Sequence, residues 1–398
     1  MLPGSIALVS SCILRMALGE AIFYDVSLRT EARARTRAAV SGVLGEAEVD
    51  PGVGLSLLDR RLDLAAAYAP RLMVQEQVGG LQVLHRASLG GTWLADRNWR
   101  AIAATQGSYG TNDLLSVSQG TAAGSSSGGT GGRTGPPVPQ IVQPIPRLTT
   151  IKYASGEASL GVDGTPAARY HASARITGFV EGGADRAAQA SLPLQRGGRL
   201  AGELDFTASQ SDVLASRLAL TVSGFATDQV DGLALVTETW RHALTVDAQV
   251  WLGVGPTVTA TRALGATTWQ VGVGGEAGAR DRFFNTLATA LTLGAAPVVD
   301  RVTGAVYERA DGTMTVTWEP SPRWAFGAMA SGGIVTQGGQ AGDKIAAGDV
   351  HAAWVPTPAW EVALGVRGLS QMPHAAATAN LSEWNVYFAV TARDRERL

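Results

Sequence analysis

His171 and Ser173 are the residues whose types and spacing come nearest to a catalytic arrangement. An imidazole can act as the general base that activates a hydroxyl nucleophile, which would make the pair a hydrolase site. Such a site also needs a group that orients the imidazole, and Glu157, on the preceding segment, is the candidate. The chemistry therefore depends on which elements carry these residues and on the face toward which each side chain points.

The segment around His171 has the pattern of a β-strand. From residue 169 to 180, apolar or small residues alternate with polar ones, so the two faces of the strand differ. The alternation is clearest near the start of the chain, where the apolar positions are Ile22, Tyr24, Val26 and Leu28. It recurs up to the last strand, 381–392, where the large apolar positions are Trp384, Val386, Phe388 and Val390.

This repeated alternation predicts an all-β fold with a single domain. No amphipathic helix is present to cover the apolar faces, and a closed barrel whose apolar face meets lipid needs no such cover. In its aromatic, alternating closing strand the chain resembles bacterial outer-membrane β-barrel proteins. Over residues 22–392 the resemblance implies a transmembrane antiparallel up-and-down β-barrel of about 18 strands, with about 16 as the alternative.

The connections between strands fall into two classes. Trp318, Trp324, Trp354 and Trp360 adjoin short turns, where amphipathic rings rest well at the level of lipid headgroups. Short turns face the periplasm in outer-membrane barrels, and an even number of strands places both termini on that side as well. The longest connection, 110–147, is rich in Gly, Ser and Pro. It predicts an extracellular loop or a plug folded into the lumen, with a domain linker as the third possibility.

The two ends of the chain differ from the barrel pattern. Residues 1–21 contain an apolar stretch followed by small residues of the kind found at cleavage sites, which predicts a signal peptide. Cys12 follows two serines, so lipid attachment at this cysteine is an alternative to its removal with the signal peptide. Residues 393–398 are charged and predict a tail beyond the closing strand, whereas familiar outer-membrane barrels end on an aromatic residue.

Composition excludes several function classes. The formal net charge is −2, so no basic field exists to bind nucleic acid. The single cysteine excludes an internal disulfide and a metal site built from cysteines. The histidines have no metal-ligand spacing, and the glycine pairs are not followed by a helix as in nucleotide-binding motifs. We therefore expect no metal and no other cofactor.

The polar strand faces should line the lumen of such a barrel, and their charges are nearly balanced. The sequence is compatible with two arrangements of these charges: a hydrated channel, or ion-pair networks that partly fill the interior. The number of strands favours the channel, because a barrel of this size encloses more volume than side chains fill. The basic residues near the N-terminus could attract anionic solutes, or could simply keep that face hydrated. The residues expected to line the lumen are Arg29, Glu31, Arg33, Arg35, Arg169, His171, Arg175, Glu203, Asp205, Arg217, Asp247, Arg309, Asp349 and Arg367.

The same alternation weakens the hydrolase hypothesis. His-x-Ser on a strand resembles the site of outer-membrane phospholipases and lipid A deacylases, which act on lipid with an outward catalytic face. Here His171 and Ser173 fall on the inward face, between Arg169 and Arg175. We therefore expect no enzyme, and a lipid hydrolase that uses His171 and Ser173 is kept as a remote alternative.

The sequence thus predicts a channel in the outer membrane of a Gram-negative bacterium. It would pass hydrophilic solutes or secreted polysaccharide without covalent chemistry. An occluded structural or adhesive barrel, whose loops bind partners at the cell surface, is the alternative, and a soluble all-β protein is the third. The partners implied are outer-membrane lipid, the outer-membrane barrel assembly machinery and periplasmic export components, with no nucleic acid.

Overall fold

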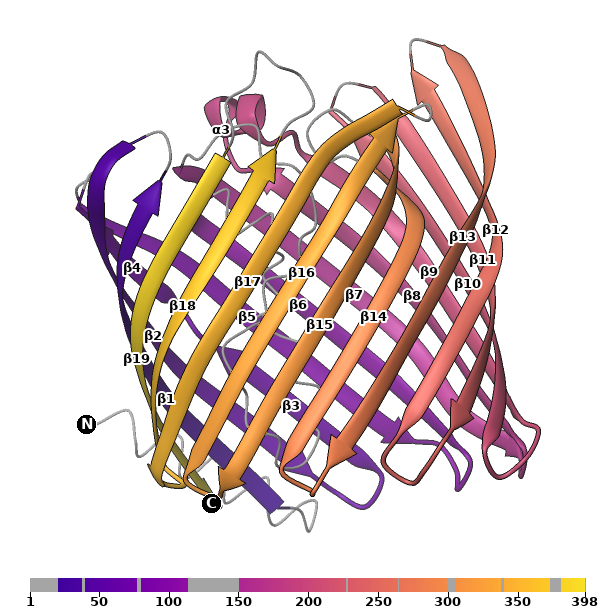
Figure 1. The fold of residues 1–398 in the computed structure, drawn as a ribbon, viewed down its shortest axis with the longest axis horizontal. Coiled ribbons are helices and arrows are strands. Elements are labelled where there is room, and N and C mark those ends of the chain that lie inside the picture. The colour runs from indigo at the N-terminus through magenta and orange to yellow at the C-terminus, as the bar shows by residue number, and fades with distance from the viewer. Residues whose placement is uncertain are drawn as a thin grey trace, which may run out of the picture.

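The computed structural model describes residues 21–37, 40–76, 80–113, 150–226, 228–263, 265–299, 305–337, 340–372 and 381–397. These residues form one antiparallel sheet that closes into a barrel of tilted strands (Figure 1). The predicted signal peptide up to residue 20, and the predicted long loop from residue 114 onward, lie outside the described residues.

The strands follow one another round the barrel in chain order. They are β1 (Ala21–Arg37), β2 (Val40–Leu58), β3 (Leu62–Tyr68), β4 (Arg71–Gln75), β5 (Leu81–Leu94), β6 (Trp99–Asp113), β7 (Thr150–Ala167), β8 (Tyr170–Gly183), β9 (Gln195–Thr207), β10 (Asp212–Phe225), β11 (Val230–Ala243), β12 (Gln249–Ala263), β13 (Ala266–Phe283), β14 (Leu287–Val299), β15 (Val306–Ser321), β16 (Trp324–Gln337), β17 (Gln340–Thr357), β18 (Trp360–Met372) and β19 (Leu381–Arg397).

The strand count of the barrel is eighteen in the described chain, because β3 and β4 occupy one strand position. Both pair with β2 on one side and with β5 on the other. Pro70, which has no N–H to donate to a neighbouring strand, lies at the break between them. β1 pairs with both β2 and β19, which closes the sheet. The predicted all-β, antiparallel barrel of about 18 strands is therefore confirmed.

The two ends of the barrel differ. Phe23 pairs with Arg397, so both ends of the described chain lie at one rim, which we call the turn end. The connections at this rim are short, for example 322–323 and 358–359. The other rim, the α3 end, carries the connection between β8 and β9 with the short helix α3 (Arg186–Ser191) (Figure 1). No helix in the described part of the chain is long and apolar enough to cross a membrane.

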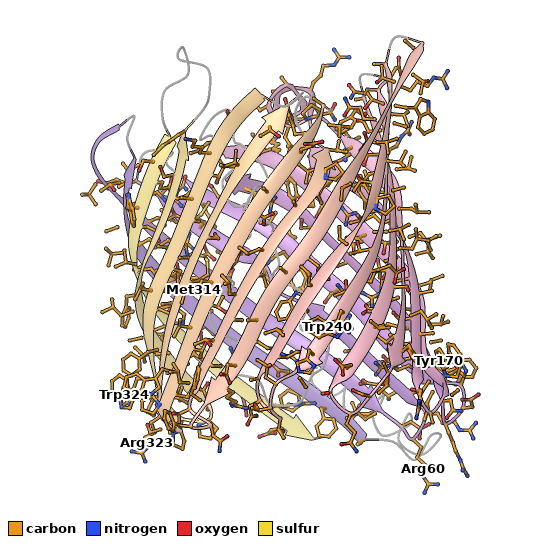
Figure 2. The ribbon with its side chains drawn as sticks, turned by 45° about the vertical axis from the view of Figure 1, so that its right-hand side comes forward. Arg60, Tyr170, Trp240, Met314, Arg323 and Trp324 are labelled. Carbon is orange, nitrogen blue, oxygen red and sulfur yellow. The ribbon has the colours of Figure 1, made fainter. Side chains whose placement is uncertain are left out.

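The outer face of the barrel is apolar and open. Val271 and Trp269 are 79% and 69% exposed, and many other outward side chains of this kind are close to half exposed. At the turn end the Trp324 ring stacks on Phe326 with centroids 6.1 Å apart and lies tilted beside Trp354 at 6.3 Å, and Figure 2 shows Trp324 at this rim. An apolar band bordered by aromatic rings is the outer surface of a barrel embedded in lipid.

Residues 244–248 form a turn before β12. One strand boundary differs from the prediction. β19 continues to Arg397, so the charged residues after Ala392 pair with β1 in place of forming a free tail.

β11 carries charged side chains on both of its faces. Arg241 points inward, where it forms ion pairs with Glu203 and Asp205. Glu238 is exposed on the outer face and accepts a hydrogen bond of 2.7 Å from Ser216 Oγ. This carboxylate lies two residues from outward-facing Trp240, which is 43% exposed.

Candidate functional site

The inner face of the barrel is the candidate functional site, and the structure places the predicted residues in two groups. Arg169 and Asp247 lie in turns at the turn end, outside any strand. The other twelve lie on strands, in alternation with outward residues such as Leu28 (44% exposed) and Ile176 (59% exposed). They are Arg29, Glu31, Arg33, Arg35, His171, Arg175, Glu203, Asp205, Arg217, Arg309, Asp349 and Arg367.

The first group of inward charges, cluster A, spans β1, β2, β4, β5 and β19. Arg33 is at its centre, with Glu46 at 3.1 Å, Glu48 at 2.5 Å and Glu31 also in direct contact. Its five arginines and five carboxylates are Arg29, Arg33, Arg35, Arg71, Arg86, Glu31, Glu46, Glu48, Asp50 and Glu383. Each arginine contacts at least one carboxylate at 3.1 Å or less.

Cluster A is buried despite its charge. The side chains of Glu31 and Arg35 are only 2% and 5% exposed. The register explains why opposite charges meet: β1 and β2 are antiparallel, so the inward arginines of β1 lie beside the inward glutamates of β2, and Arg33 pairs directly with Glu46. Buried charges remain stable only when they are paired, and each arginine of cluster A has a carboxylate partner.

The second group, cluster B, lies on β9, β10, β11 and β13 toward the turn end. Arg217 contacts Glu276 at 2.5 Å and Glu203 at 3.2 Å. Arg241 contacts Glu203 and, at 3.2 Å, Asp205. Two arginines therefore face three carboxylates, and the five side chains are 20–35% exposed, so this cluster is far more accessible to water than cluster A.

A third polar group lies on β17, β18 and β19, beside cluster A. Asp349 accepts hydrogen bonds from Arg367 Nε at 3.2 Å and from Tyr387 OH at 3.3 Å, and its carboxylate is 2.6 Å from His351 Nδ1. The Tyr387 ring lies over Gly365 of the next strand, where an added Cβ would be 2.5 Å from the ring. Glycine is required there because the close approach of the ring leaves no room for a side chain.

The inner wall between these groups is uncharged over residues 288–292 of β14 and 313–317 of β15, on the turn side of the inward Arg309–Asp311 ion pair. Its inward residues are small or carry hydroxyls, and the Thr292 hydroxyl donates to the Thr313 carbonyl at 3.5 Å. The inward threonines of this section, which we call the threonine wall, are Thr292, Thr313, Thr315 and Thr317. A hydroxyl can donate and accept hydrogen bonds, so this wall can bind water or another hydroxyl-bearing molecule.

Near the α3 end the interior is apolar and filled. Eight residues that are 1–9% exposed form one cluster there: Leu84, Ile151, Tyr153, Ala188, Leu192, Ile345, Ala347 and Leu369. They come from β5 and β7, from the α3 connection, and from β17 and β18. In the barrel wall, β18 and β5 are separated by β19, β1, β2 and β4. Inward side chains of a wide barrel would be wet if the lumen were empty at this level. The α3 connection therefore narrows the lumen.

Three local contacts position the α3 connection. Asp185 caps α3 by accepting a hydrogen bond from Ala188 N at 2.9 Å, and this bond holds the pKa of the Asp185 carboxyl below its usual range. Gly183 packs so closely on the helix that an added Cβ would lie 2.3 Å from the Ala188 carbonyl carbon. The Ala184 N–H also donates to the Lys152 carbonyl at 2.8 Å.

The candidate hydrolase residues do not assemble into a triad. Glu157 pairs in register with Phe179 and lies 3.7 Å from Arg199, well away from His171. Asp163 takes the place beside His171 instead, 3.2 Å from Nε2, and it also accepts from Arg100 Nε at 2.8 Å. Ser173 forms no hydrogen bond with His171 in the described chain. Nothing in this geometry activates the hydroxyl.

Sequence reasoning found about half of the charged inner face. It missed Glu46, Glu48, Asp50, Arg71, Arg86, Arg241 and Glu383, which the structure adds to clusters A and B. The sequence alone could have identified them, because each occupies one of the alternate strand positions whose side chains face the lumen. Within the described residues, no three His, Cys, Asp or Glu residues are arranged to hold a metal ion.

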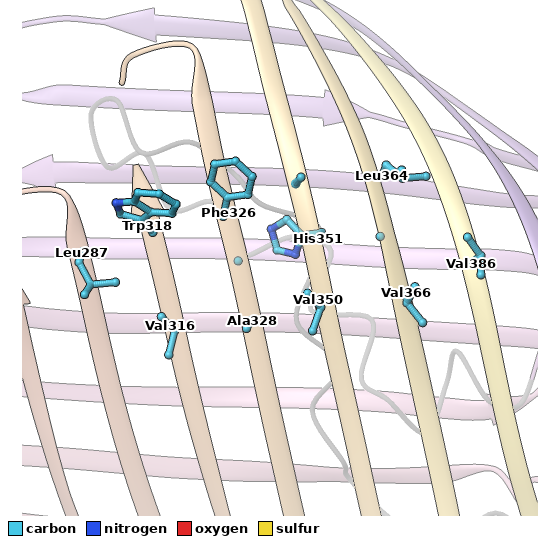
Figure 3. Close-up of a pocket in the computed structure, with 13 residues that line it drawn as sticks. Leu287, Val316, Trp318, Phe326, Ala328, Val350, His351, Leu364, Val366 and Val386 are labelled. Atoms are coloured by element: carbon cyan, nitrogen blue, oxygen red, sulfur yellow. The ribbon is translucent and has the colours of Figure 1, made fainter. Parts of the chain in front are cut away.

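A shallow groove on the outer face is distinct from the lumen. It lies across β14 to β19, with Trp318, Phe326, Val350 and Leu364 among its walls (Figure 3). The small side chains of Ala328 and Ala352 leave the hollow between these larger ones. Most of its wall residues belong to the lipid-facing surface, so the groove is part of the membrane contact, and His351 of the third polar group lines it beside Gly327.

Comparison with known proteins agrees with this architecture. The FrpB iron transporter of Neisseria meningitidis, F5-1 variant in its apoprotein form, aligns with 93% of this chain and 81% of its own, at 8% identity and a TM-score of 0.51. OpdK, an outer membrane protein of Pseudomonas aeruginosa, aligns with 94% of this chain and 99% of its own, at 10% identity and a TM-score of 0.48.

These likenesses concern the fold, which is that of outer-membrane β-barrels. The closed barrel of eighteen strands, with its apolar outer face, places the chain in the outer membrane. A search of curated proteins found no match. The EpsX exopolysaccharide export family matches residues 14–395.

Proposed function

The chain belongs to the EpsX exopolysaccharide export family, and on that premise we propose that it is the conduit through which an exopolysaccharide crosses the outer membrane. The observation that carries the proposal is the closed barrel of eighteen strands with a polar inner face. A barrel of this size encloses more space than its own side chains fill. The protein supplies a passage and no covalent chemistry.

The conduit is narrowed near the α3 end by the apolar cluster. An apolar constriction resists hydration and can gate a channel by excluding water. We therefore propose a gated conduit, in which the α3 connection moves when cargo passes. The turn end faces the periplasm in this arrangement, where components of the export machinery would deliver the polymer.

Conductance across a planar bilayer tests the proposal. The refolded full chain is compared with Leu192→Asp, which places a charge in the apolar cluster, and with Leu200→Asn, an outward position on β9 that leaves the lumen unchanged. We expect a larger unit conductance for Leu192→Asp than for the wild type and the control. If all three proteins fold in detergent but none conducts, the conduit is excluded and an occluded surface barrel is favoured.

A further inference from the structure

The charges inside the barrel bear on the class of polymer that it carries. Resting on the proposed function, we infer that the lumen is built for a neutral, hydroxyl-rich polysaccharide and disfavours a polyanionic one. Three features of the inner face support this: the pairing of its arginines, the carboxylate excess in cluster B, and the threonine wall.

The arginines of cluster A are not available to a polyanion. Arg33 contacts three carboxylates, and Arg35 lies 3.0 Å from both Glu46 and Glu383. A passing carboxylate or sulfate would have to displace one of these partners. The displaced glutamate would then be a buried charge without a counterion, which is strongly unfavourable. The basic residues near the N-terminus thus form a structural core and do not attract anions.

Cluster B is more accessible and carries the opposite sign. Its two arginines face three carboxylates, so one negative charge is uncompensated. Arg367, in the third group, is likewise paired with Asp349 at 3.2 Å. At the level of clusters A and B the wall is therefore balanced or slightly acidic. Such a potential raises the local concentration of cations and lowers that of anions.

The uncharged part of the wall matches a sugar polymer. Thr315 and Thr317 pair in register with Ala290 and Ala288, so hydroxyls stand beside small residues over this section. Sugar hydroxyls can donate to and accept from these side chains, and each bond replaces a similar bond to water. The polymer is then held weakly at many points, as continuous passage requires. An isolated inward cation, Arg175, is exposed and forms no ion pair in the described chain.

The test is ion selectivity and current block of the full chain in planar bilayers, with Leu192→Asn, which wets the apolar cluster without adding a charge, as the second channel. Under a KCl gradient we expect a reversal potential that indicates no selectivity or weak cation selectivity. Neutral dextran oligosaccharides should block the current at lower concentration than alginate oligosaccharides of the same length. Anion selectivity, or stronger block by alginate, would overturn the inference and leave the conduit intact. If neither protein conducts, the proposed function as a conduit is excluded, and the inference about its cargo is excluded with it.

Two variants of cluster B give opposite expectations, which separates an effect of charge from general damage. Glu276→Gln removes one carboxylate beside Arg217 and should shift the permeability ratio toward anions by about twofold to fivefold. Arg217→Gln should shift the ratio toward cations by a similar factor. Arg175→Gln, which breaks no ion pair, should give a smaller shift toward cations. Shifts of the same sign in the first two variants would show that cluster B does not set the selectivity.

Discussion

Arg33 shows how single residues stabilise the barrel wall. Its guanidinium lies among Glu31, Glu46 and Glu48, and its side chain is only 12% exposed. The planar group offers five N–H donors in a fixed arrangement, which suits three carboxylates at once. Without it, three buried negative charges would lie together with fewer counterions.

We therefore predict that Arg33→Ala is strongly destabilising. Removal of one partner from a buried ion pair typically costs about 3–5 kcal/mol, and here the arginine serves three carboxylates. The free energy of unfolding can be measured in lipid vesicles by urea titration with tryptophan fluorescence. The matched control is Arg175→Ala, an exposed inward arginine without an ion pair in the described chain, which should change stability by about 0.5 kcal/mol or less. Equal losses for both variants would contradict the importance of pairing.

At this scale the sequence predicted the direction of side chains better than their contacts. Alternation gave the face on which Arg33 lies, because a one-residue shift would place charged side chains in lipid. It did not give the partner, because Glu46 and Glu48 meet Arg33 only through the register of β1 with β2. His171 shows the same limit: its face was predictable, but the carboxylate beside it is Asp163 and not Glu157.

At the scale of elements, strands were predictable and α3 was not. The strands have a period of two sustained over many residues, and the tryptophans next to short turns mark their ends. The helix has only six residues and no apolar period long enough to detect. Its helical form depends on the Asp185 cap and on packing of Ala188 and Leu192 in the apolar cluster. Such tertiary support leaves little trace in the sequence.

The cap of α3 predicts a dependence of conductance on pH. The folded pKa of the Asp185 carboxyl is lowered by its hydrogen bond from Ala188 N, so the charged carboxylate stabilises the folded connection above the unfolded pKa of about 3.9. This stabilisation is lost as pH falls through the lower, folded pKa. We expect the channel to open more often below about pH 4.

The control for this pH effect is Asp185→Asn, because asparagine caps helices well but does not titrate. Single-channel recordings at neutral pH and on acidification should show a rise in open probability for the wild type only. An identical rise in the variant would assign the effect to other groups.

At the scale of the whole molecule, the decisive property is the difference between the two faces of the wall. Met314, about midway along the wall in Figure 2, points outward and is 52% exposed, whereas its neighbour Thr313 points inward. We predict that Met314→Arg destabilises the barrel in lipid vesicles by about 2–4 kcal/mol, the cost of arginine on the lipid face near the midplane. Thr313→Arg should cost much less, because a polar lumen can hydrate the added charge. Urea titration of both variants measures the difference, and equal costs would show that the outward face does not meet lipid at this depth.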